Sequence, residues 1–322
     1  MKTKETYLKD IRQGDKIASS FLVAEKSMAY SQKGSPYLNV RLKDKTGEID
    51  GKVWDNVPAL DPVFKKGDII FIEGRTQTYR NALQVSIITI KKCTPEEIDP
   101  ADFLPVSRMD TDAMYQDLLV YLDKISSRLL KDLLAAFFHD EEASELFRRA
   151  PAAKGFHHNY LGGLLEHTLS VVRLLDRAAD HYPQLNRDLL LAGGMLHDIG
   201  KIYEFSYDNL VEYSDEGRMI GHLVMGVEMI NKKIDNIPDF PPRLALALRH
   251  IILSHHGEFE FGSPKRPKTM EALVVHFMDD LDAKLNGFEI FVAADSANTE
   301  TEWTPFNRFF ERYLYKGKTP VD

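Results

Sequence analysis

The hydrophobic pattern of this 322-residue chain changes period once, near residue 95, and this change limits the possible fold more than any other feature. Between Gly14 and Cys93, five short stretches alternate apolar and β-branched residues with polar ones, as strands do. After a segment with three prolines, 94–106, apolar residues recur at helical spacing over most of the remaining chain. The sequence therefore predicts a multidomain protein, with an all-β module followed by an all-α module.

The β module has the size and turn pattern of a small barrel. Turn-forming residues separate its stretches, including Asp44-Lys45-Thr46-Gly47 and Lys66-Gly67-Asp68. Five strands within about 80 residues, without a long helix, are typical of a closed barrel of the OB type. The segment PYLNVRLKDKTGEIDGKVWD also resembles the second and third strands of nucleic-acid-binding OB folds.

Aromatic and cationic side chains in this module suit a single-stranded nucleic acid, because bases stack on rings and phosphates pair with cations. The candidates for stacking and phosphate contact are Tyr37, Arg41, Lys43, Trp54, Arg75, Tyr79 and Arg80, with Lys52 and Phe71 as further possibilities. An ordinary alternative exists for each, a core aromatic or a solvated surface cation. Oligosaccharide or protein binding by the same barrel also stays open.

The charge is divided unevenly between the two modules. The chain has a net charge of −8, but residues 1–97 contain 17 Lys and Arg against 13 Asp and Glu, whereas the remainder contains 24 against 36. This division indicates a mildly basic module and an acidic one whose carboxylates could bind cations.

Composition also limits the compartment. A single cysteine, Cys93, excludes an internal disulfide and fits a reducing cytoplasm. The chain has no run of about 18 apolar residues, so no membrane span is expected. The N-terminal stretch is polar and lacks an apolar signal core, and export is therefore not expected.

In the second module, helical periodicity extends over Asp110–Phe138 as one apolar face, and a further helix starting at Glu141 should stop at Pro151. We expect residues 1–95 to form the barrel and 96–150 a linker with connecting helices. Residues 151–322 should then form a metal-binding helical domain with a C-terminal tail.

Histidines and aspartates lie within or beside several of the apolar helical segments. The stretch GGMLHDIGK places His197 and Asp198 at the end of an apolar run, where Gly200 should terminate the helix. Such a pair offers a divalent metal one nitrogen and one carboxylate, whose second oxygen can bridge to another ion. A lone histidine on such a helix is more often a core residue. Here, however, other helical segments contain further potential metal ligands: His167, His222, His255, His256 and Asp279.

This order of residues is similar to the H…HD…D signature of the HD-domain metal-dependent phosphohydrolases. The resemblance implies that one ion lies among His167, His197, Asp198 and Asp279, and that Asp198 bridges to a second ion held by His222, His255 and His256. Asp279 is preferred to Asp280 by its place in the family pattern D-x-L-D-A. Imidazoles and carboxylates without a thiolate suit Mn²⁺, Fe, Zn²⁺ or Co.

Other residues near this signature are candidates for the chemistry. Lys201 could hold a non-bridging phosphate oxygen, or it could balance the C-terminal end of the preceding helix. His157 and His158 precede the first ligand helix and are candidates for a phosphate or leaving-group role. Asp198 is the predicted shared ligand of the catalytic centre.

Over nearly the whole chain, the sequence resembles the YhaM family of bacterial 3′→5′ exoribonucleases. The matching stretches are YLNVRLKDKTGEIDGKVWD, HHNYLGGLLEHTLSV, GGMLHDIGK, ILSHHGE and TEWTPFNRFFERYLYKG. The resemblance implies an N-terminal OB-fold barrel followed by an all-α HD domain, with two divalent ions, Mn²⁺ favoured. It further implies release of nucleoside 5′-monophosphates from single-stranded RNA, with single-stranded DNA as a second possible substrate.

Two alternatives stay open at this point. The first is an HD-type nucleotidase or cyclic-nucleotide phosphodiesterase in which the barrel is an accessory domain. The second is a non-catalytic nucleic-acid-binding protein with a relic HD domain. The sequence leaves the oligomeric state undetermined.

Overall fold

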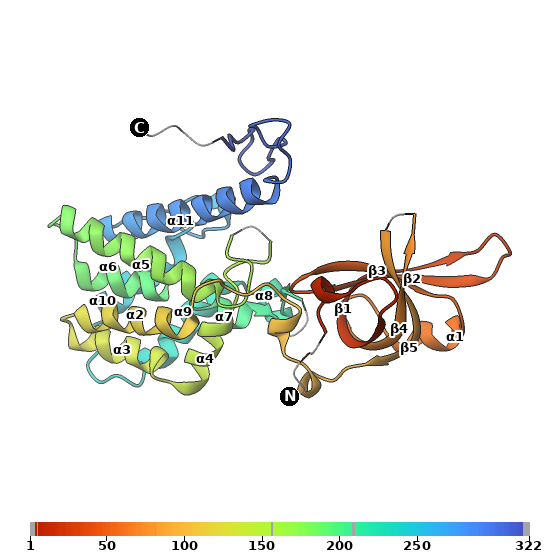
Figure 1. Ribbon diagram of the computed structural model, residues 1–322. Helices are drawn as coiled ribbons and strands as arrows, with labels where there is room; N and C mark the ends of the chain where they lie inside the picture. Colours follow the sequence, from red (N-terminus) through yellow and green to blue (C-terminus); the bar gives the residue numbers. More distant parts are fainter. Residues whose placement is uncertain (1–3, 5, 81, 156, 208–209, 318–322) are drawn as a thin grey trace. The chain divides into compact units, whose positions relative to one another are not determined.

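The computed structural model describes residues 4, 6–80, 82–155, 157–207 and 210–317, and Figure 1 shows their ribbon. It separates into two compact units. The barrel unit comprises Met1–Val106 together with Ser206–Glu212, and the helical unit comprises Ser107–Phe205 and Tyr213–Asp322. The helices that follow residue 106 thus group with the helical unit.

The barrel unit contains a closed five-stranded barrel, drawn in red to orange in Figure 1. Its strands neighbour one another in the order β1-β2-β3-β5-β4, with β3 and β5 parallel and the other pairs antiparallel. The predicted OB-type barrel is therefore confirmed. The strand bounds are β1 (Lys16–Tyr30), β2 (Pro36–Asp44), β3 (Gly47–Val53), β4 (Ile69–Tyr79) and β5 (Ala82–Lys92), and the short helix α1 (Val57–Leu60) follows β3.

The alternating pattern of β2 explains why this segment becomes a barrel strand. Leu38, Val40 and Leu42 point inward and are at most 2% exposed, while the residues between them face outward. At the end of β2, the buried Asp44 carboxylate accepts the backbone N–H of Thr46 at 2.8 Å and that of Leu8 at 2.9 Å. This carboxylate therefore fixes the turn into β3, and with it the register that aligns the outer faces of both strands.

The helical unit is built from ten helices within the part of the chain that the structure describes. None of the described helices is both long and apolar enough to cross a membrane. The bounds are α2 (Thr111–Lys124), α3 (Arg128–Phe138), α4 (Glu141–Arg149), α5 (Gly163–His181), α6 (Arg187–Leu196), α7 (Lys201–Glu204), α8 (Asp215–Met219), α9 (His222–Ile234), α10 (Pro242–Ser254) and α11 (Met270–Ala294).

The expectation of one helical face from Asp110 to Phe138 is corrected by a break. The chain leaves α2 at Ile125, which is extended, and α3 starts at Arg128. The backbone N–H groups of Ser126 and Ser127 donate to the Asp188 carboxylate at 3.1 and 2.7 Å. The apolar spacing continues across the break, so periodicity alone could not reveal it.

Gly200 has a different role from the predicted helix terminator. Its backbone is right-handed helical, and the short helix α7 begins directly after it. A Cβ atom at this position would lie 2.1 Å from the carbonyl oxygen of His222. Glycine is therefore required because α9 approaches the chain here, and this close approach places His222 beside Asp198.

Candidate metal centre and nucleic-acid interface

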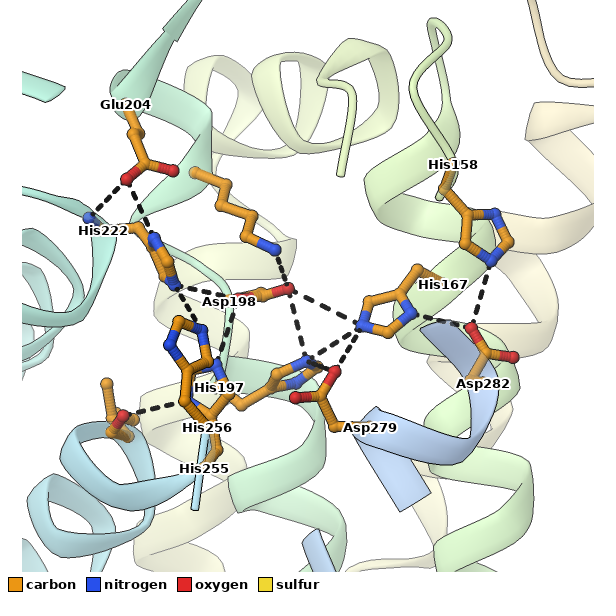
Figure 2. Close-up of polar contacts among 12 residues, drawn as sticks. His158, His167, His197, Asp198, Glu204, His222, His255, His256, Asp279 and Asp282 are labelled. Carbon is orange, nitrogen blue, oxygen red and sulfur yellow. Dashed lines mark hydrogen bonds and ion pairs between the residues drawn. The ribbon is translucent and has the colours of Figure 1, made fainter. Parts of the chain in front are cut away.

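The predicted metal ligands come from five separate helices and converge on one point in the helical unit (Figure 2). His167 lies on α5 and Asp279 on α11, while His222 is the first residue of α9. His197 and Asp198 directly follow α6, and His255 and His256 directly follow α10. Five of the seven ligands thus lie at helix ends, whereas His167 and Asp279 project from within their helices.

Four of these residues form the first half of the centre. The Nε2 atom of His167 lies 3.2 Å from Nε2 of His197, 3.1 Å from Oδ1 of Asp279 and 3.6 Å from Oδ2 of Asp198. Nε2 of His197 lies 3.4 Å from the same Asp198 oxygen. Two nitrogens and two carboxylate oxygens thus face one small volume.

The other oxygen of Asp198 belongs to the second half of the centre. Asp198 Oδ1 lies 3.5 Å from Nε2 of His222 and 3.4 Å from Nε2 of His255. Nε2 of His256 is 3.2 Å from that of His222. The two oxygens of one carboxylate therefore face two different groups of nitrogen atoms, as Figure 2 shows.

Hydrogen bonds on the far side of the imidazole rings fix their orientation. The Nδ1 atoms of His197, His255 and His256 lie 2.7, 2.9 and 3.0 Å from backbone carbonyl oxygens. A carbonyl oxygen can only accept, so each Nδ1 carries the hydrogen. In the neutral ring the lone pair is then on Nε2, the atom that faces the centre.

Two carboxylates, neither of them predicted from the sequence, orient the rings of the remaining histidines in the same way. Asp282 Oδ2 lies 2.7 Å from Nδ1 of His167, and Glu204 Oε1 lies 2.9 Å from Nδ1 of His222. A signal for Asp282 existed in its spacing: it lies three residues after Asp279, on the same face of α11. Asp280, by contrast, forms an exposed ion pair with Lys284.

The charges of the centre are set by burial and by these partners. Burial opposes ionisation of Asp198 and Asp279, but nearby Lys201 and the histidines outweigh it and hold both carboxyl pKa values below their usual range. Burial lowers the pKa of His255, and it lowers the pKa of His256 to about 3. His255 and His256 thus present neutral imidazoles beside an ionised carboxylate.

The first half differs because His167 lies between two carboxylates. Burial acts to lower its pKa, yet hydrogen bonds to Asp279 and Asp282 and their charges raise the pKa of His167 to about 10. Without a bound cation, this imidazole is therefore protonated at neutral pH.

The donor set fits divalent cations. Among the described residues, Asp198 Oδ1 and His255 Nε2 are buried atoms that make no hydrogen bond. An acceptor oxygen and a lone-pair nitrogen that are buried together without donors are costly unless a cation lies between them. His197, Asp198 and His255 each offer one potential ligand atom, and these three atoms all lie within 4.8 Å of one another.

Lys201 lies in contact with the shared carboxylate. Its ammonium nitrogen is 2.6 Å from Oδ2 of Asp198, and the residue is 7% exposed. Burial opposes the charge, but the neighbouring carboxylate prevails and the pKa of Lys201 is raised. The lysine therefore brings a permanent positive charge to the centre.

His158 and His157 lie on the loop before α5, beside His167. His158 is buried, with Nε2 3.1 Å from Asp282 and Nδ1 2.8 Å from the hydroxyl of Tyr160. Its backbone fits there because Gly163 has no Cβ, which would lie 2.0 Å from the His158 carbonyl oxygen. The ring of His157 is 5.6 Å from that of His167, and burial lowers the pKa of His157 to about 3.

On the barrel, two of the predicted stacking residues form one surface. The rings of Tyr37 and Trp54 stack with centroids 4.7 Å apart, and Trp54 is 44% exposed. Tyr37 and Arg41 also line a depression of about 290 Å³ on the outer face of β1, β2 and β3, together with Asn39 and Lys52. A stacked pair with one exposed ring, beside polar side chains, is suited to bases.

Two of the predicted cations of the barrel, Arg41 and Lys43, form ion pairs with acidic residues. Arg41 lies 3.4 Å from Asp50 and Lys43 lies 3.6 Å from Glu48 across the β2–β3 pair. Such exposed pairs contribute about 0–1 kcal/mol each, so a phosphate can compete for the cation. Arg75 joins the same outer face, because β5 places Ser86 between it and Lys52.

Tyr79 and Arg80 lie at the end of β4, apart from the Tyr37–Trp54 stack in the strand register. Tyr79 is 57% exposed, and the Arg80 guanidinium lies over its ring at 5.3 Å. A ring with a cation on one face and solvent around it offers both contact types that a nucleotide needs. Of the other candidate aromatics, Phe71 is only partly buried.

Family models match both units of the chain. The model described as HD domain matches residues 164–284, and the model described as OB-fold nucleic acid binding domain matches residues 22–92. The fold and the histidine–aspartate centre thus define the class: an HD-domain hydrolase that carries an OB-fold domain.

Curated relatives identify the family within this class. The 3′-5′ exoribonuclease YhaM of Listeria welshimeri is 32% identical over 283 residues, which cover 88% of this chain and 90% of the relative. The YhaM of Bacillus subtilis is 31% identical and covers 85% of this chain and 86% of its own. The YhaM of a Geobacillus strain is 33% identical, with 85% and 84% covered. The chain belongs to the YhaM family, as its sequence resemblance had indicated.

Proposed function

We propose that this protein is a divalent-metal-dependent 3′→5′ exoribonuclease that degrades single-stranded RNA to nucleoside 5′-monophosphates, with single-stranded DNA as a further substrate. The observation that carries the proposal is the split use of Asp198, whose two oxygens face two groups of imidazole nitrogens. The names of the YhaM relatives support the RNA substrate and the direction of degradation.

In this proposal the first cation is held by His167, His197, Asp198 and Asp279. The second is held by Asp198 with His222, His255 and His256. Nitrogen and carboxylate oxygen donors suit Mn²⁺, which we favour, and also Fe, Co and Zn²⁺. Bound ions would supply Lewis-acid chemistry, since they lower the pKa of water and neutralise charge on a phosphodiester.

The remaining side chains of the centre orient ligands and substrate. Asp282 and Glu204 hold the imidazole rings of His167 and His222, so that their Nε2 atoms stay directed at the cations. The Lys201 ammonium, already paired with Asp198, would contact a non-bridging phosphate oxygen. A positive charge held there offsets the charge that develops on phosphorus-bound oxygens.

His157 and His158 have different parts in this scheme. His158 already bonds Asp282 and Tyr160, which makes it a positioning residue for His167. His157 lies beside His167 and stays neutral, so we assign it to the contact with the leaving group.

The barrel holds the strand through Tyr37 and Trp54, and this raises the substrate concentration at the tethered centre.

Product analysis on labelled oligonucleotides tests the proposal. RNA and DNA strands labelled at either end would be incubated with Mn²⁺ or with a chelator. We expect 5′-labelled RNA to shorten stepwise, 3′-labelled RNA to release labelled mononucleotide at once, and chelator to stop both. Cleavage only of mononucleotides or cyclic nucleotides would favour the accessory-barrel alternative, and no metal-dependent cleavage would favour a relic domain.

A further inference from the structure

A short turn beside the metal centre presents two phenylalanine rings to solvent. The 3₁₀ turn Phe259–Phe261 follows the ligand pair His255–His256 by three residues. Phe259 and Phe261 are each 61% exposed. A phenyl ring has no polar group that could hydrogen-bond to water. Two such rings exposed on one turn are therefore unfavourable unless a ligand or partner covers them.

The turn is fixed to the metal centre by a hydrogen bond. The carbonyl oxygen of Phe261 accepts from Nδ1 of His256 at 3.0 Å, and Nε2 of the same ring faces His222 in the centre. One imidazole ring therefore separates the turn from the proposed second cation. Buried Ser263, whose hydroxyl lies 2.9 Å from the Leu253 carbonyl oxygen, ties the end of the turn to α10.

Cations accompany the two rings. The guanidinium of Arg266 lies 5.0 Å from the centroid of the Phe259 ring and 2.6 Å from the Glu258 carboxylate. Lys265 and Lys268 are exposed on the same loop. Rings with adjacent cations combine the two contact types by which proteins bind single strands, stacking for bases and charge for phosphates.

We propose that Phe259 and Phe261 stack on the bases next to the scissile phosphodiester, with Arg266 contacting the adjoining phosphate. This inference rests on the proposed nuclease function and adds a base-binding subsite within the helical unit. Stacking tolerates all four bases, so the subsite would bind the 3′-terminal nucleotides without regard to sequence. A protein partner covering these rings is the rival outcome of the test.

Kinetics on a short oligoribonucleotide test the subsite in the full-length enzyme. We expect Phe259→Ala and Phe261→Ala each to raise KM about tenfold, with a smaller change in kcat. Phe259→Trp keeps an aromatic ring at this position and should therefore have a KM close to that of the wild type. Phe306→Ala, a ring that is 50% exposed in the C-terminal segment, is the matched control and should leave KM unchanged.

A second substrate separates stacking from indirect effects. On the same oligonucleotide with abasic 3′-terminal nucleotides, wild type and the Phe259→Ala and Phe261→Ala variants should have equal KM values. An unchanged KM on normal RNA, or an equal loss on both substrates, would overturn the subsite.

If the wild type cleaved no RNA, the proposed nuclease function would be wrong. Binding of a fluorescently labelled oligoribonucleotide would then still test whether the two rings stack on bases. Weaker binding by the alanine variants would then support the platform, and unchanged binding would overturn it.

Discussion

The metal centre and the outer face of the barrel use the same kinds of side chain in opposite ways. In the centre, His167 and His197 are fully buried, and their ring nitrogens have fixed partners. On the barrel, Trp54 and Tyr79 are 44% and 57% exposed, and Arg41 and Lys43 form exposed ion pairs. A reacting group requires one geometry, whereas strand binding needs contacts that can rearrange along a sequence.

The difference also explains where each region is vulnerable. A buried ionised group that loses its partner is not solvated by water instead. Each substitution that removes a side chain from the centre should therefore cause a large loss of free energy. An exposed cation that loses its partner is solvated at little cost.

Asp198→Asn should have the largest effect. The amide cannot present two anionic oxygens to the two halves of the centre, so we expect RNA cleavage to fall on the order of a thousandfold. RNA binding, measured by fluorescence anisotropy, should stay within about twofold if the barrel supplies the binding. The matched control is Asp280→Asn, on the exposed Asp280–Lys284 pair. Activity near that of the wild type in Asp198→Asn would contradict the expectation that the buried centre is more sensitive to substitution than the barrel face.

Asp282→Asn should weaken the first cation site without removing a ligand. Asp282 holds Nδ1 of His167, and loss of such a partner typically costs 10–100-fold in metal affinity. A titration of activity against Mn²⁺ should show the midpoint shifted to higher concentration, with activity recovered at saturation. An unshifted midpoint would mean that His167 does not depend on this carboxylate for its orientation. Glu204→Gln is the equivalent test for His222 in the second half.

Metal binding should release a proton from the first half. The pKa of His167 is raised to about 10 in the metal-free protein, so the imidazole is protonated at neutral pH and must lose that proton to bind a cation. Affinity should therefore rise with pH up to about 10, roughly tenfold per unit below that value. Calorimetry in buffers of different ionisation enthalpy measures the released proton.

The same charge affects the stability of the metal-free protein. Because the folded pKa of His167 lies above its ordinary value, its contribution is complete below about pH 6.5 and is lost as pH rises through about 10. In the second half, His255 and His256 have lowered pKa values and should release no proton when a cation binds. Cation binding without proton release in the wild type would contradict this difference between the halves.

Tyr37→Ala and Trp54→Ala should have the smallest effect on chemistry. Loss of one stacking ring weakens single-strand binding about tenfold, so KM for a long RNA should rise while kcat is nearly unchanged. Ile88→Ala, which removes an exposed aliphatic side chain of β5, is the control. A fall in kcat at constant KM would show that the barrel face takes part in the reaction.

The sequence predicted those features that depend on pattern. Alternation marked the five strands, and helical spacing placed His167, His222 and Asp279 on helices that the structure contains. What it missed depends on tertiary contact. The break between α2 and α3 comes from the distant carboxylate of Asp188, and the glycine at 200 serves the approach of α9. Likewise, Glu204 could be recognised as a partner of His222 only once their segments were seen together.

The electron paramagnetic resonance spectrum of the Mn²⁺-loaded protein would show whether two cations share Asp198, because two Mn²⁺ ions bridged by one carboxylate are magnetically coupled. We predict a coupled signal in the wild type at two ions per chain, and its loss in Asp198→Ala. A spectrum of isolated Mn²⁺ only, in a wild-type enzyme that degrades RNA, would contradict a shared two-cation centre.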